Sequence, residues 1–145
     1  MIRNFVRIGG KRIFPLPLIS IVQTDGSFSR RGGAACAFLV RNQGGDQVLA
    51  KRLTLSDART STETEWASVY HGLSAAVELD QECIGLENDC LSVVAGLLGK
   101  AKMKQEYAQY YHYKIMKTAG YTGWTGIRWI PRGLNRADAL FDGYR

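Results

Sequence analysis

Apolar residues in the first third of the chain form short, loosely alternating runs, a pattern typical of strands. Residues 18–24 are rich in Ile and Val and lead into Asp25-Gly26-Ser27, and residues 34–41 form a second apolar run. Asn42-Gln43-Gly44-Gly45-Asp46 is a hairpin signal, after which residues 47–53 return as a third strand. The short links predict an antiparallel meander of three strands.

The hydrophobic period then changes to that of a helix. The apolar stripe comprises Trp66, Val69, Leu73, Ala76 and Val77. These spacings of three and four predict an amphipathic helix of about five turns that begins near Ser61 or Thr62. Thr62 and Glu65 fit a capping box at its start.

The remaining elements alternate between strand and helix. The pattern predicts a strand over 83–88, a helix over 91–98 closed by Gly99, a helix over 104–118, a strand over 127–131 and a short C-terminal helix containing Asp138. Crossover helices favour parallel pairing of the strands that they connect. We therefore predict an α/β fold with a five-stranded mixed sheet, made of the antiparallel meander plus two parallel strands and flanked by helices.

Composition indicates one ordinary globular domain. The chain has 145 residues, of which 46% are hydrophobic and 22% charged. The longest nearly uncharged apolar stretch, residues 14–22, contains two prolines and is shorter than the ~20 residues of a membrane span. We expect neither a membrane span nor a signal peptide. The three cysteines form no Cys-x-x-Cys pair, which favours a reducing compartment and a cytoplasmic location.

Charge is distributed unevenly along the chain. Residues 60–99 contain seven acids and no Lys or Arg, so all 19 cations lie outside this block. The block carries −7 and the rest of the chain +13, which together give the net charge of +6. Solvated faces of different composition would explain this pattern. So would a cation-dependent nuclease that attracts a polyanion with its flanks and concentrates carboxylates at its centre.

Four carboxylates occupy the starts or ends of predicted elements. Asp25 ends the first strand, Asp89 ends the fourth, Asp138 opens the last helix, and Glu65 lies in the first turn of the long helix. If the first and fourth strands are adjacent and parallel, Asp25 and Asp89 share one sheet edge, where open α/β sheets bind ligands. Clustered carboxylates repel one another unless a cation binds. Oxygen ligands suit Mg²⁺ or Mn²⁺, and two such ions can catalyse phosphodiester cleavage.

Each acid also has a purely structural explanation. Asp25 before Gly26 fits a turn, Glu65 a capping box, Asp89 a helix N-cap, and Asp138 a favourable charge at a helix start. Capping explains any one of them alone. It explains four such positions in one short domain less well.

Four segments of the chain, in this order, match the motifs of a known family. They are Thr24-Asp25-Gly26-Ser27, Thr62-Glu63-Thr64-Glu65-Trp66-Ala67 with Gly72-Leu73, Glu87-Asn88-Asp89-Cys90, and Trp129-Ile130-Pro131-Arg132-Gly133-Leu134-Asn135-Arg136-Ala137-Asp138-Ala139-Leu140. Together they resemble ribonuclease H type 1, in the subgroup with the Pro-Arg-x-x-Asn-x-Ala-Asp-x-Leu ending. The resemblance runs from Ile19 to about Phe141.

The resemblance implies an RNase H-like fold and a metal-dependent endoribonuclease. Enzymes of this family use two Mg²⁺ ions, which Mn²⁺ can replace, to hydrolyse the RNA strand of an RNA/DNA hybrid, leaving 5′-phosphate and 3′-hydroxyl ends. Asp25, Glu65, Asp89 and Asp138 would be the catalytic, metal-binding quartet. Glu63 competes with Glu65, but the family glutamate directly precedes a bulky residue and stands before a Gly-Leu pair, as Glu65 does. Residues 1–17 would be a basic N-terminal extension, and residues 18–145 the catalytic domain.

Substrate contacts are also implied. The wide minor groove of a hybrid exposes 2′-hydroxyls to small polar side chains, for which Ser27, Asn88 and Asn135 are candidates. Thr60 and Ser61 are candidates for a DNA phosphate at the helix start, although capping explains them slightly better. Arg132 and Arg136 lie in the closing loop, where some relatives carry a histidine, so the sequence assigns no proton shuttle.

The expected partner is an RNA/DNA hybrid duplex, with no membrane and no obligate protein partner, and the chain is expected to be a monomer. A junction resolvase or DNA nuclease with a similar acidic centre is an alternative function, and a non-catalytic nucleic-acid-binding module is another. Lysines surround a tyrosine-rich segment in the helix over 104–118. We expect Tyr107 and Tyr111 to pack in the core, and the lysines either to bind phosphate or to form a solvated face.

Overall fold

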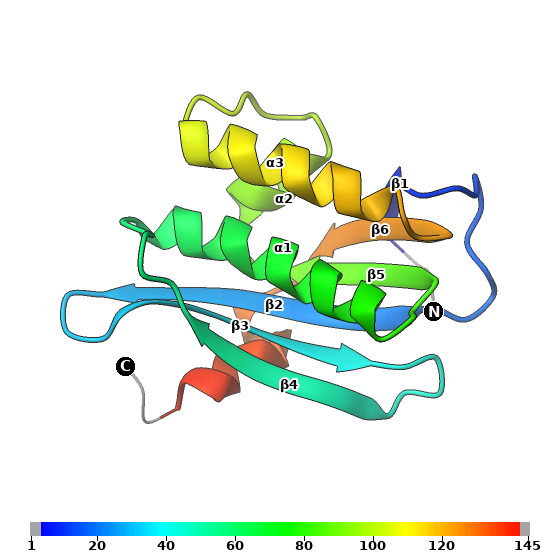
Figure 1. Ribbon diagram of the computed structural model, residues 1–145, viewed down its shortest axis with the longest axis horizontal. Helices are drawn as coiled ribbons and strands as arrows, with labels where there is room; N and C mark the ends of the chain where they lie inside the picture. The colour runs from blue at the N-terminus through cyan, green and yellow to red at the C-terminus, as the bar shows by residue number, and fades with distance from the viewer. Residues whose placement is uncertain (1–3, 143–145) are drawn as a thin grey trace.

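The computed structural model describes residues 4–142, which form one mixed sheet with helices packed against it (Figure 1). The strands are β1 (Val6–Gly9), β2 (Ser20–Ser29), β3 (Gly33–Arg41), β4 (Gln47–Thr54), β5 (Cys83–Asn88) and β6 (Trp124–Trp129). The helices are α1 (Ser61–Glu78), α2 (Leu91–Leu97) and α3 (Glu106–Ala119), followed by the 3₁₀ helices η1 (Arg132–Leu134) and η2 (Arg136–Phe141). No helix within these residues is both long and apolar enough to cross a bilayer.

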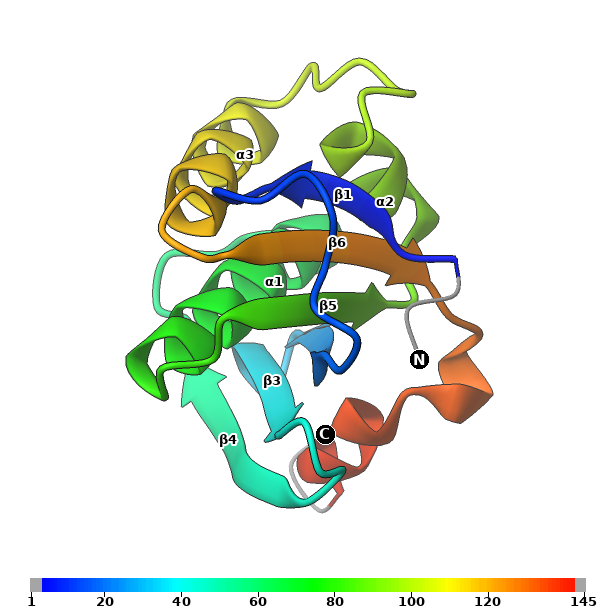
Figure 2. The ribbon, with the colours of Figure 1, turned by 90° about the vertical axis from the view of Figure 1, so that its right-hand side faces the viewer.

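The strand order is β1-β6-β5-β2-β3-β4, which confirms the α/β class and the mixed sheet. β2, β3 and β4 form the antiparallel meander, and β5 pairs in parallel with both β2 and β6. The predicted strand count of five was wrong, because β1 adds a sixth strand antiparallel to β6 (Figure 2). This four-residue strand buries only Ile8, so its sequence carries almost no alternation.

β1 belongs to the segment that we expected to be a basic N-terminal extension, residues 1–17. Within that segment, Lys11 and Arg12 also donate backbone hydrogen bonds to the carbonyls of Thr122 and Gly123. The first three residues of the expected extension, and the last three of the expected domain over 18–145, lie outside the described residues.

The core lies between the sheet and the helices. α1 and α3 run side by side over one face of the sheet (Figure 1). On that face Val22, Val40 and Leu73 are completely buried. On the other face η2 packs against β2 and β3, where Phe141 covers Ala35 and Ala37. Tyr107 and Tyr111 pack against the main core, as predicted.

β2 is longer than the sequence pattern indicated. Its parallel pairing with β5 stops at Thr24 opposite Asn88, but its pairing with β3 continues to Ser29 opposite Gly33. Asp25 therefore lies inside a strand and not in a turn, at the point where the neighbouring strand β5 has just ended. β6 likewise begins at Trp124, earlier than predicted, because Cys83 pairs with it there.

The start of α1 corrects the predicted capping box of Thr62 and Glu65. The N-cap is Thr60, whose Oγ1 accepts a hydrogen bond from the backbone nitrogen of Glu63 at 3.1 Å. The Glu63 Oε1 accepts one from the backbone nitrogen of Arg59 at 3.0 Å. Because the helix begins at Ser61, the third helical position falls on Glu63. The carboxylate of Glu65 is therefore not used for capping.

Gly26 allows α1 to cross β2 at close range. A Cβ at this position would lie 2.4 Å from Thr64 Oγ1 and 2.6 Å from the backbone nitrogen of Glu65. Real Cβ atoms do not approach backbone atoms so closely, so any other residue would force the helix away from the strand. The Asp-Gly pair thus reflects helix packing, and not the turn that sequence reasoning offered as an alternative.

We predict that Gly26→Ala lowers the free energy of unfolding by about 1–3 kcal/mol, because the added methyl group overpacks the contact between α1 and β2. Urea denaturation measures the loss. Gly133→Ala is the matched control, since a Cβ at Gly133 meets nothing within 4 Å. Equal stability of the two variants would contradict this account of the crossing.

Candidate active site

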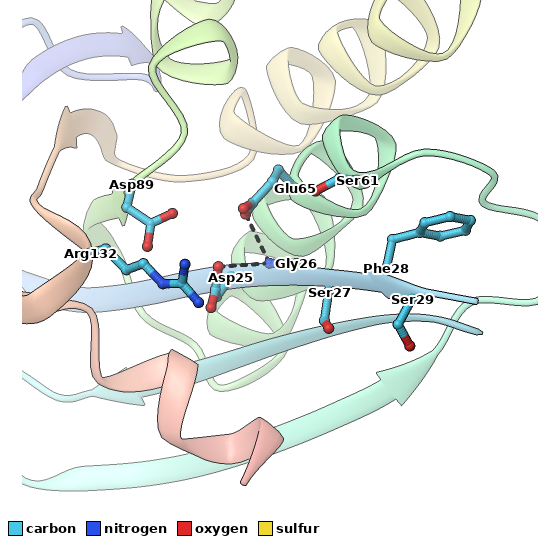
Figure 3. Close-up of a pocket in the computed structure, with 9 residues that line it drawn as sticks. All are labelled: Asp25, Gly26, Ser27, Phe28, Ser29, Ser61, Glu65, Asp89 and Arg132. Carbon is cyan, nitrogen blue, oxygen red and sulfur yellow. Dashed lines mark hydrogen bonds between the residues drawn. The ribbon is translucent and has the colours of Figure 1, made fainter. Parts of the chain in front are cut away.

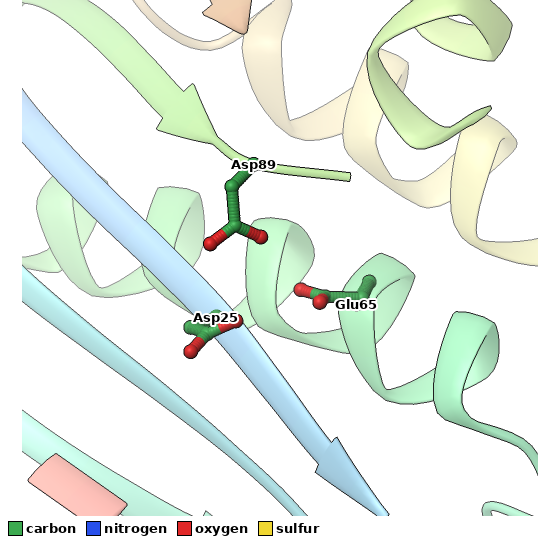
Figure 4. Close-up of side chains that lie close together, drawn as sticks. All are labelled: Asp25, Glu65 and Asp89. Carbon is green, nitrogen blue, oxygen red and sulfur yellow. The ribbon is translucent and has the colours of Figure 1, made fainter. Parts of the chain in front are cut away.

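Three of the four predicted carboxylates meet at one edge of the sheet. Asp25 comes from β2, Glu65 from α1 and Asp89 from the residue after β5 (Figure 4). One carboxylate oxygen from each lies within 4.8 Å of the other two. The structure thus brings together side chains that are separated by 40 and 24 positions in the sequence.

Two local features of the fold produce this meeting. The parallel pairing of β2 and β5 ends at Thr24 and Asn88, so the next residues, Asp25 within β2 and Asp89 directly after β5, lie at the same end of the paired strands. The Gly26 crossing then places α1 over β2. There the Gly26 backbone nitrogen donates to Glu65 Oε1 at 2.8 Å and to Asp25 Oδ1 at 3.0 Å (Figure 3).

Asp138 borders this trio from η2. Its side chain forms a hydrogen bond with Asp25, and its Oδ1 lies 3.8 Å from Arg132 Nη2. A third of the Asp138 side chain is accessible, whereas Asp25 is 4% exposed. The predicted quartet therefore consists of a tight group of three and a fourth carboxylate that contacts Asp25 from the rim.

Ionisation of all three carboxylates in the trio is electrostatically unfavourable. Burial, together with the nearby carboxylates Glu65 and Asp89, raises the pKa of Asp25 to about 9. Burial and the charge of Asp89 raise the pKa of Glu65 to about 7, although the hydrogen bond from Gly26 opposes this shift. Burial also raises the pKa of Asp89, against the effects of Asn135 and Arg132. Without a cation, the site favours proton uptake.

The carboxylates line an open pocket of about 320 Å³ (Figure 3). Ser27 and Ser61 line it on one side, and Arg132 extends toward Asp25 and Asp89 from the other. The Arg132 side chain is 72% exposed, so it is free to reach an anion that enters. Phe28 lies at the far end of the pocket with 42% of its surface exposed.

Two predicted substrate contacts instead lie beneath the carboxylates. Asn88 is fully buried, and its amide donates to Thr24 Oγ1 at 3.0 Å and to Glu65 Oε1 at 3.4 Å. Asn135 is 4% exposed and donates to the Thr24 carbonyl at 2.8 Å and to Asp89 Oδ2 at 3.3 Å. These amides hold and orient the acids, and burial leaves them little surface to offer to a duplex.

Apart from Ser27 on β2, which is only 8% exposed, the other predicted contacts lie at the surface. Thr60 and Ser61 are exposed at the N-terminus of α1, and Arg136 is exposed at the start of η2. The Thr60 oxygen serves as the N-cap, as the structural explanation required. The hydroxyl hydrogen of Thr60 is still able to donate to a phosphate.

Sequence reasoning missed a buried network next to the pocket. Gln23 Nε2 donates to Glu87 Oε1 at 2.9 Å and to the Leu134 carbonyl at 3.2 Å, while its Oε1 accepts from the backbone nitrogen of Arg136 at 3.1 Å. Glu87 is 4% exposed and accepts from Arg128 Nε at 2.7 Å. Gln23 therefore fastens the loop of Arg132 and Asp138 to the sheet, in an orientation that Glu87 fixes.

The spacing of these residues was an available signal. Gln23 and Glu87 each lie two positions before an aspartate of the trio, and they are register partners across β2 and β5. Positions two apart on a strand share a face. Polar residues at such positions would indicate a supporting layer, but only once the parallel pairing was known.

This fold and its carboxylate group have counterparts among known proteins. The family described as reverse transcriptase-like matches residues 23–140. No curated protein matches the chain. Among solved structures, the N-terminal RNase H domain of Rv2228c from Mycobacterium tuberculosis is similar, with 19% identity, a TM-score of 0.77 and coverage of 88% of this chain and 96% of that one.

Two further structures have the same fold. RNase H1 of the halophilic archaeon Halobacterium salinarum NRC-1 is 25% identical, with a TM-score of 0.74 and coverage of 83% of this chain and 92% of that one. LC11-RNase H1 in complex with an RNA/DNA hybrid is 20% identical, with a TM-score of 0.71 and the same coverages.

The sheet order and the carboxylate edge define the class, an α/β domain with the RNase H-like fold. The chain belongs to the reverse transcriptase-like family, whose model spans most of its length. The resemblance to ribonuclease H type 1 and the expected enzyme class, ribonuclease H, are thereby confirmed.

We predict that Gln23→Met loosens the loop that carries Arg132 and Asp138, because it removes the partners of Glu87, Leu134 and Arg136. The free energy of unfolding should fall by about 1–3 kcal/mol, and the Arg136 amide should exchange its hydrogen faster. Hydrogen exchange measured by NMR tests this. Gln47→Met, at an exposed position on β4, is the control; an unchanged rate at Arg136 in Gln23→Met would contradict the role of Gln23.

We predict that the metal-free protein loses stability as the pH rises from about 4 to about 9. In the folded state the pKa values of Asp25 and Glu65, about 9 and about 7, exceed their ordinary values of 3.8 and 4.5. The folded protein therefore binds more protons than the unfolded chain in this window, and its free energy of unfolding falls with pH.

Asp25→Asn removes one of these ionisations. In EDTA at about pH 8 it should be more stable than the wild type by about 1 kcal/mol or more, with a smaller difference at about pH 5. Urea denaturation at the two pH values measures both. The exposed Asp57 provides the control Asp57→Asn, which should keep the wild-type pH dependence. A wild-type protein that becomes more stable with rising pH would refute the electrostatic account.

Proposed function

We propose that this protein is a divalent-metal-dependent endoribonuclease that hydrolyses the RNA strand of RNA/DNA hybrids, with products that end in 5′-phosphate and 3′-hydroxyl. The observation that carries the proposal is the meeting of Asp25, Glu65 and Asp89, with oxygens within 4.8 Å, in an open pocket. The similarity to an RNase H1 crystallised with such a hybrid supports the substrate class.

The donor set fits hard divalent cations. All of the clustered ligands are carboxylate oxygens, which suit Mg²⁺ and Mn²⁺ and not softer metals. Burial and mutual repulsion raise the pKa of Asp25, and positive charge at this edge would relieve that repulsion. Bound in a pair, such ions would polarise the scissile phosphate and activate water for the displacement.

Each carboxylate has a proposed role. Asp25 and Asp89 would hold the ions, since they lie directly beyond the last paired residues of the neighbouring strands β2 and β5, at the centre of the site. Glu65 would complete one ion site and orient the attacking water, because Gly26 and Asn88 fix its Oε1. Asp138, at the rim beside Asp25, would hold the second ion.

The surroundings supply contacts for the duplex. Arg132 extends over the pocket and would hold a phosphate next to the scissile bond. Ser27 and the backbone of β2 border the same pocket and would face the 2′-hydroxyl side of the minor groove. Thr60 and Ser61 would bind a phosphate of the DNA strand, because amides and the helix dipole favour anions at the start of α1. Arg136, exposed on the same loop as Arg132, would add a further phosphate contact.

We also propose that the enzyme acts as a monomer in the cytoplasm. A reducing compartment suits its three cysteine thiols, which are free, with Cys36 and Cys83 buried in the fold.

We predict that Asp25→Asn abolishes cleavage of an end-labelled RNA/DNA hybrid in Mg²⁺, by about 1,000-fold or more, while the protein stays folded. Cleavage assays with circular dichroism measure both properties. Asp57→Asn, which removes an exposed carboxylate of the same kind, should cleave at the wild-type rate. Near wild-type activity in Asp25→Asn would refute the site.

The substrate class is tested with four labelled substrates, each in Mg²⁺, in Mn²⁺ and in EDTA. These are the hybrid, duplex RNA, duplex DNA and a four-way junction. We expect metal-dependent cutting of the hybrid alone. Cutting of DNA or of the junction would favour a DNA nuclease or resolvase. Binding with no cutting would favour a non-catalytic module.

A further inference from the structure

A second surface, on the helical side of the molecule, combines exposed aromatic rings with lysines. It is a hollow of about 480 Å³ between α1 and α3, lined by Tyr70, Tyr110, Tyr113, Lys114, Lys117, Thr118 and Tyr121. We call it the tyrosine–lysine face. It shares no residue with the carboxylate pocket.

The arrangement follows from the spacing of residues along α3. Tyr110, Tyr113, Lys114 and Lys117 recur three and four positions apart and so share one side of the helix. The buried side of α3 is formed by Ala108, Ile115 and Ala119. The aromatic stripe is therefore not part of the core. Tyr110, Tyr113 and Tyr121 are 55%, 65% and 63% exposed, so more than half of each residue's surface is open to solvent.

The rings and cations of the face are held in place by one another. Lys114 Nζ lies 4.4 Å from the centre of the Tyr70 ring and donates to Tyr110 Oη at 3.1 Å. The Tyr110 ring meets Tyr111 edge-on, with centroids 5.2 Å apart. Lys117 Nζ lies 6.0 Å from the centre of the Tyr113 ring. Binding of a ligand would thus cost little conformational entropy of these side chains.

The chemistry fits one class of ligand. Exposed aromatic rings stack on unpaired bases, and lysines beside them neutralise the phosphates, which is how single-stranded nucleic acid is bound without sequence preference. Among the described residues that line this hollow there is no carboxylate, so its charge complements a polyanion. A duplex would leave the rings unused, because its base faces are already stacked.

The face lies on a different side of α1 from the carboxylate site. Tyr70 follows Glu65 on α1 by five residues, which is about 7.5 Å along the helix and about 140° around it. A smaller hollow that Thr62, Lys102 and Lys104 help to line lies between the start of α1 and α3. Cations therefore continue from the start of α1 toward the face.

We propose that the tyrosine–lysine face is a second nucleic-acid site, which binds an unpaired single strand through base stacking on Tyr110 and Tyr113 and phosphate contacts from Lys114 and Lys117. This binding goes beyond the proposed cleavage of hybrids and does not require it. It would allow the protein to hold the overhang of a hybrid that is only partly paired.

The test measures binding of a labelled oligothymidylate of about 12 nucleotides by fluorescence anisotropy in EDTA, where no cleavage takes place. The double variant Tyr110→Ala, Tyr113→Ala should bind at least about tenfold more weakly than the wild type, because two stacking platforms are lost. The matched variant Tyr110→Phe, Tyr113→Phe keeps both rings and should bind within about twofold of the wild type.

The lysines are tested through the dependence of binding on salt. Lys117→Ala should reduce the slope of log affinity against log salt by about 0.7. Lys51→Ala removes an exposed lysine on β4, at the opposite edge of the sheet, and should leave the slope unchanged. Equal effects of the two substitutions would mean that general charge, and not this face, attracts the strand.

Three results would overturn the proposal. The first is that the wild type does not bind the oligonucleotide, and the second is that the double alanine variant binds it with wild-type affinity. The third is that polyglutamate displaces the strand from the wild type and from the double alanine variant equally well. The last result would indicate a protein partner. The double alanine variant should cleave a blunt hybrid at the wild-type rate. Failure of the wild type to cleave hybrids would refute the proposed function and leave the binding result standing.

Discussion

The desolvation and mutual repulsion of three carboxylates is the constraint on which the site depends. Asp25 is almost fully buried, and Glu65 and Asp89 are held close enough for an oxygen of each to lie within 4.8 Å of the others. Left to itself, such a group would separate or take up protons. It stays together because each acid is anchored to rigid backbone: one lies within β2, one directly follows the parallel strand β5, and the third projects from the helix that packs against β2. Fold stability thus holds negative charge where a cation would bind.

The polar layer beneath the acids makes this arrangement specific. Thr24, Asn88 and Asn135 form a connected set of buried hydrogen bonds, and the two amides reach Glu65 and Asp89 from below. Gln23 and Glu87 extend the same layer to the closing loop. A buried amide left without partners costs roughly 1–3 kcal/mol, so each member restricts the positions open to the next. The layer therefore orients the acids and also fixes the loop that carries Arg132 and Asp138.

Acidic and basic residues lie in different segments of the chain. The segment over 60–99, which has no Lys or Arg, supplies Glu65 and Asp89, and the cations lie in the rest of the chain. Two of them, Lys114 and Lys117, stand among tyrosines on α3, away from the carboxylate pocket. The net charge of +6 is therefore a poor description of the molecule. A polyanion would meet positive surfaces beside an acidic centre.

Much of the architecture could be predicted from local sequence. The meander, the long helix and the parallel strand over 83–88 follow from hydrophobic period and turn residues, which act over a few positions. The choice of Asp25, Glu65, Asp89 and Asp138 came from ordered motifs, and the structure places these four side chains together. β1 was missed because four residues with one buried side chain carry no period. The capping box was misplaced because a shift of two residues in a helix start is invisible in the sequence.

The residue types of the site were determined by the sequence, and their functions were decided by the tertiary structure. Asn88 and Asn135 look like surface contacts in a motif, but strand register and the fold of the closing loop bury them under the acids. Gln23 belongs to no recognised motif, and it supports the site only because the parallel pairing of β2 and β5 places it beside Glu87. Register, helix crossing and burial depend on contacts between residues far apart in the chain. Periodicity and spacing do not contain that information.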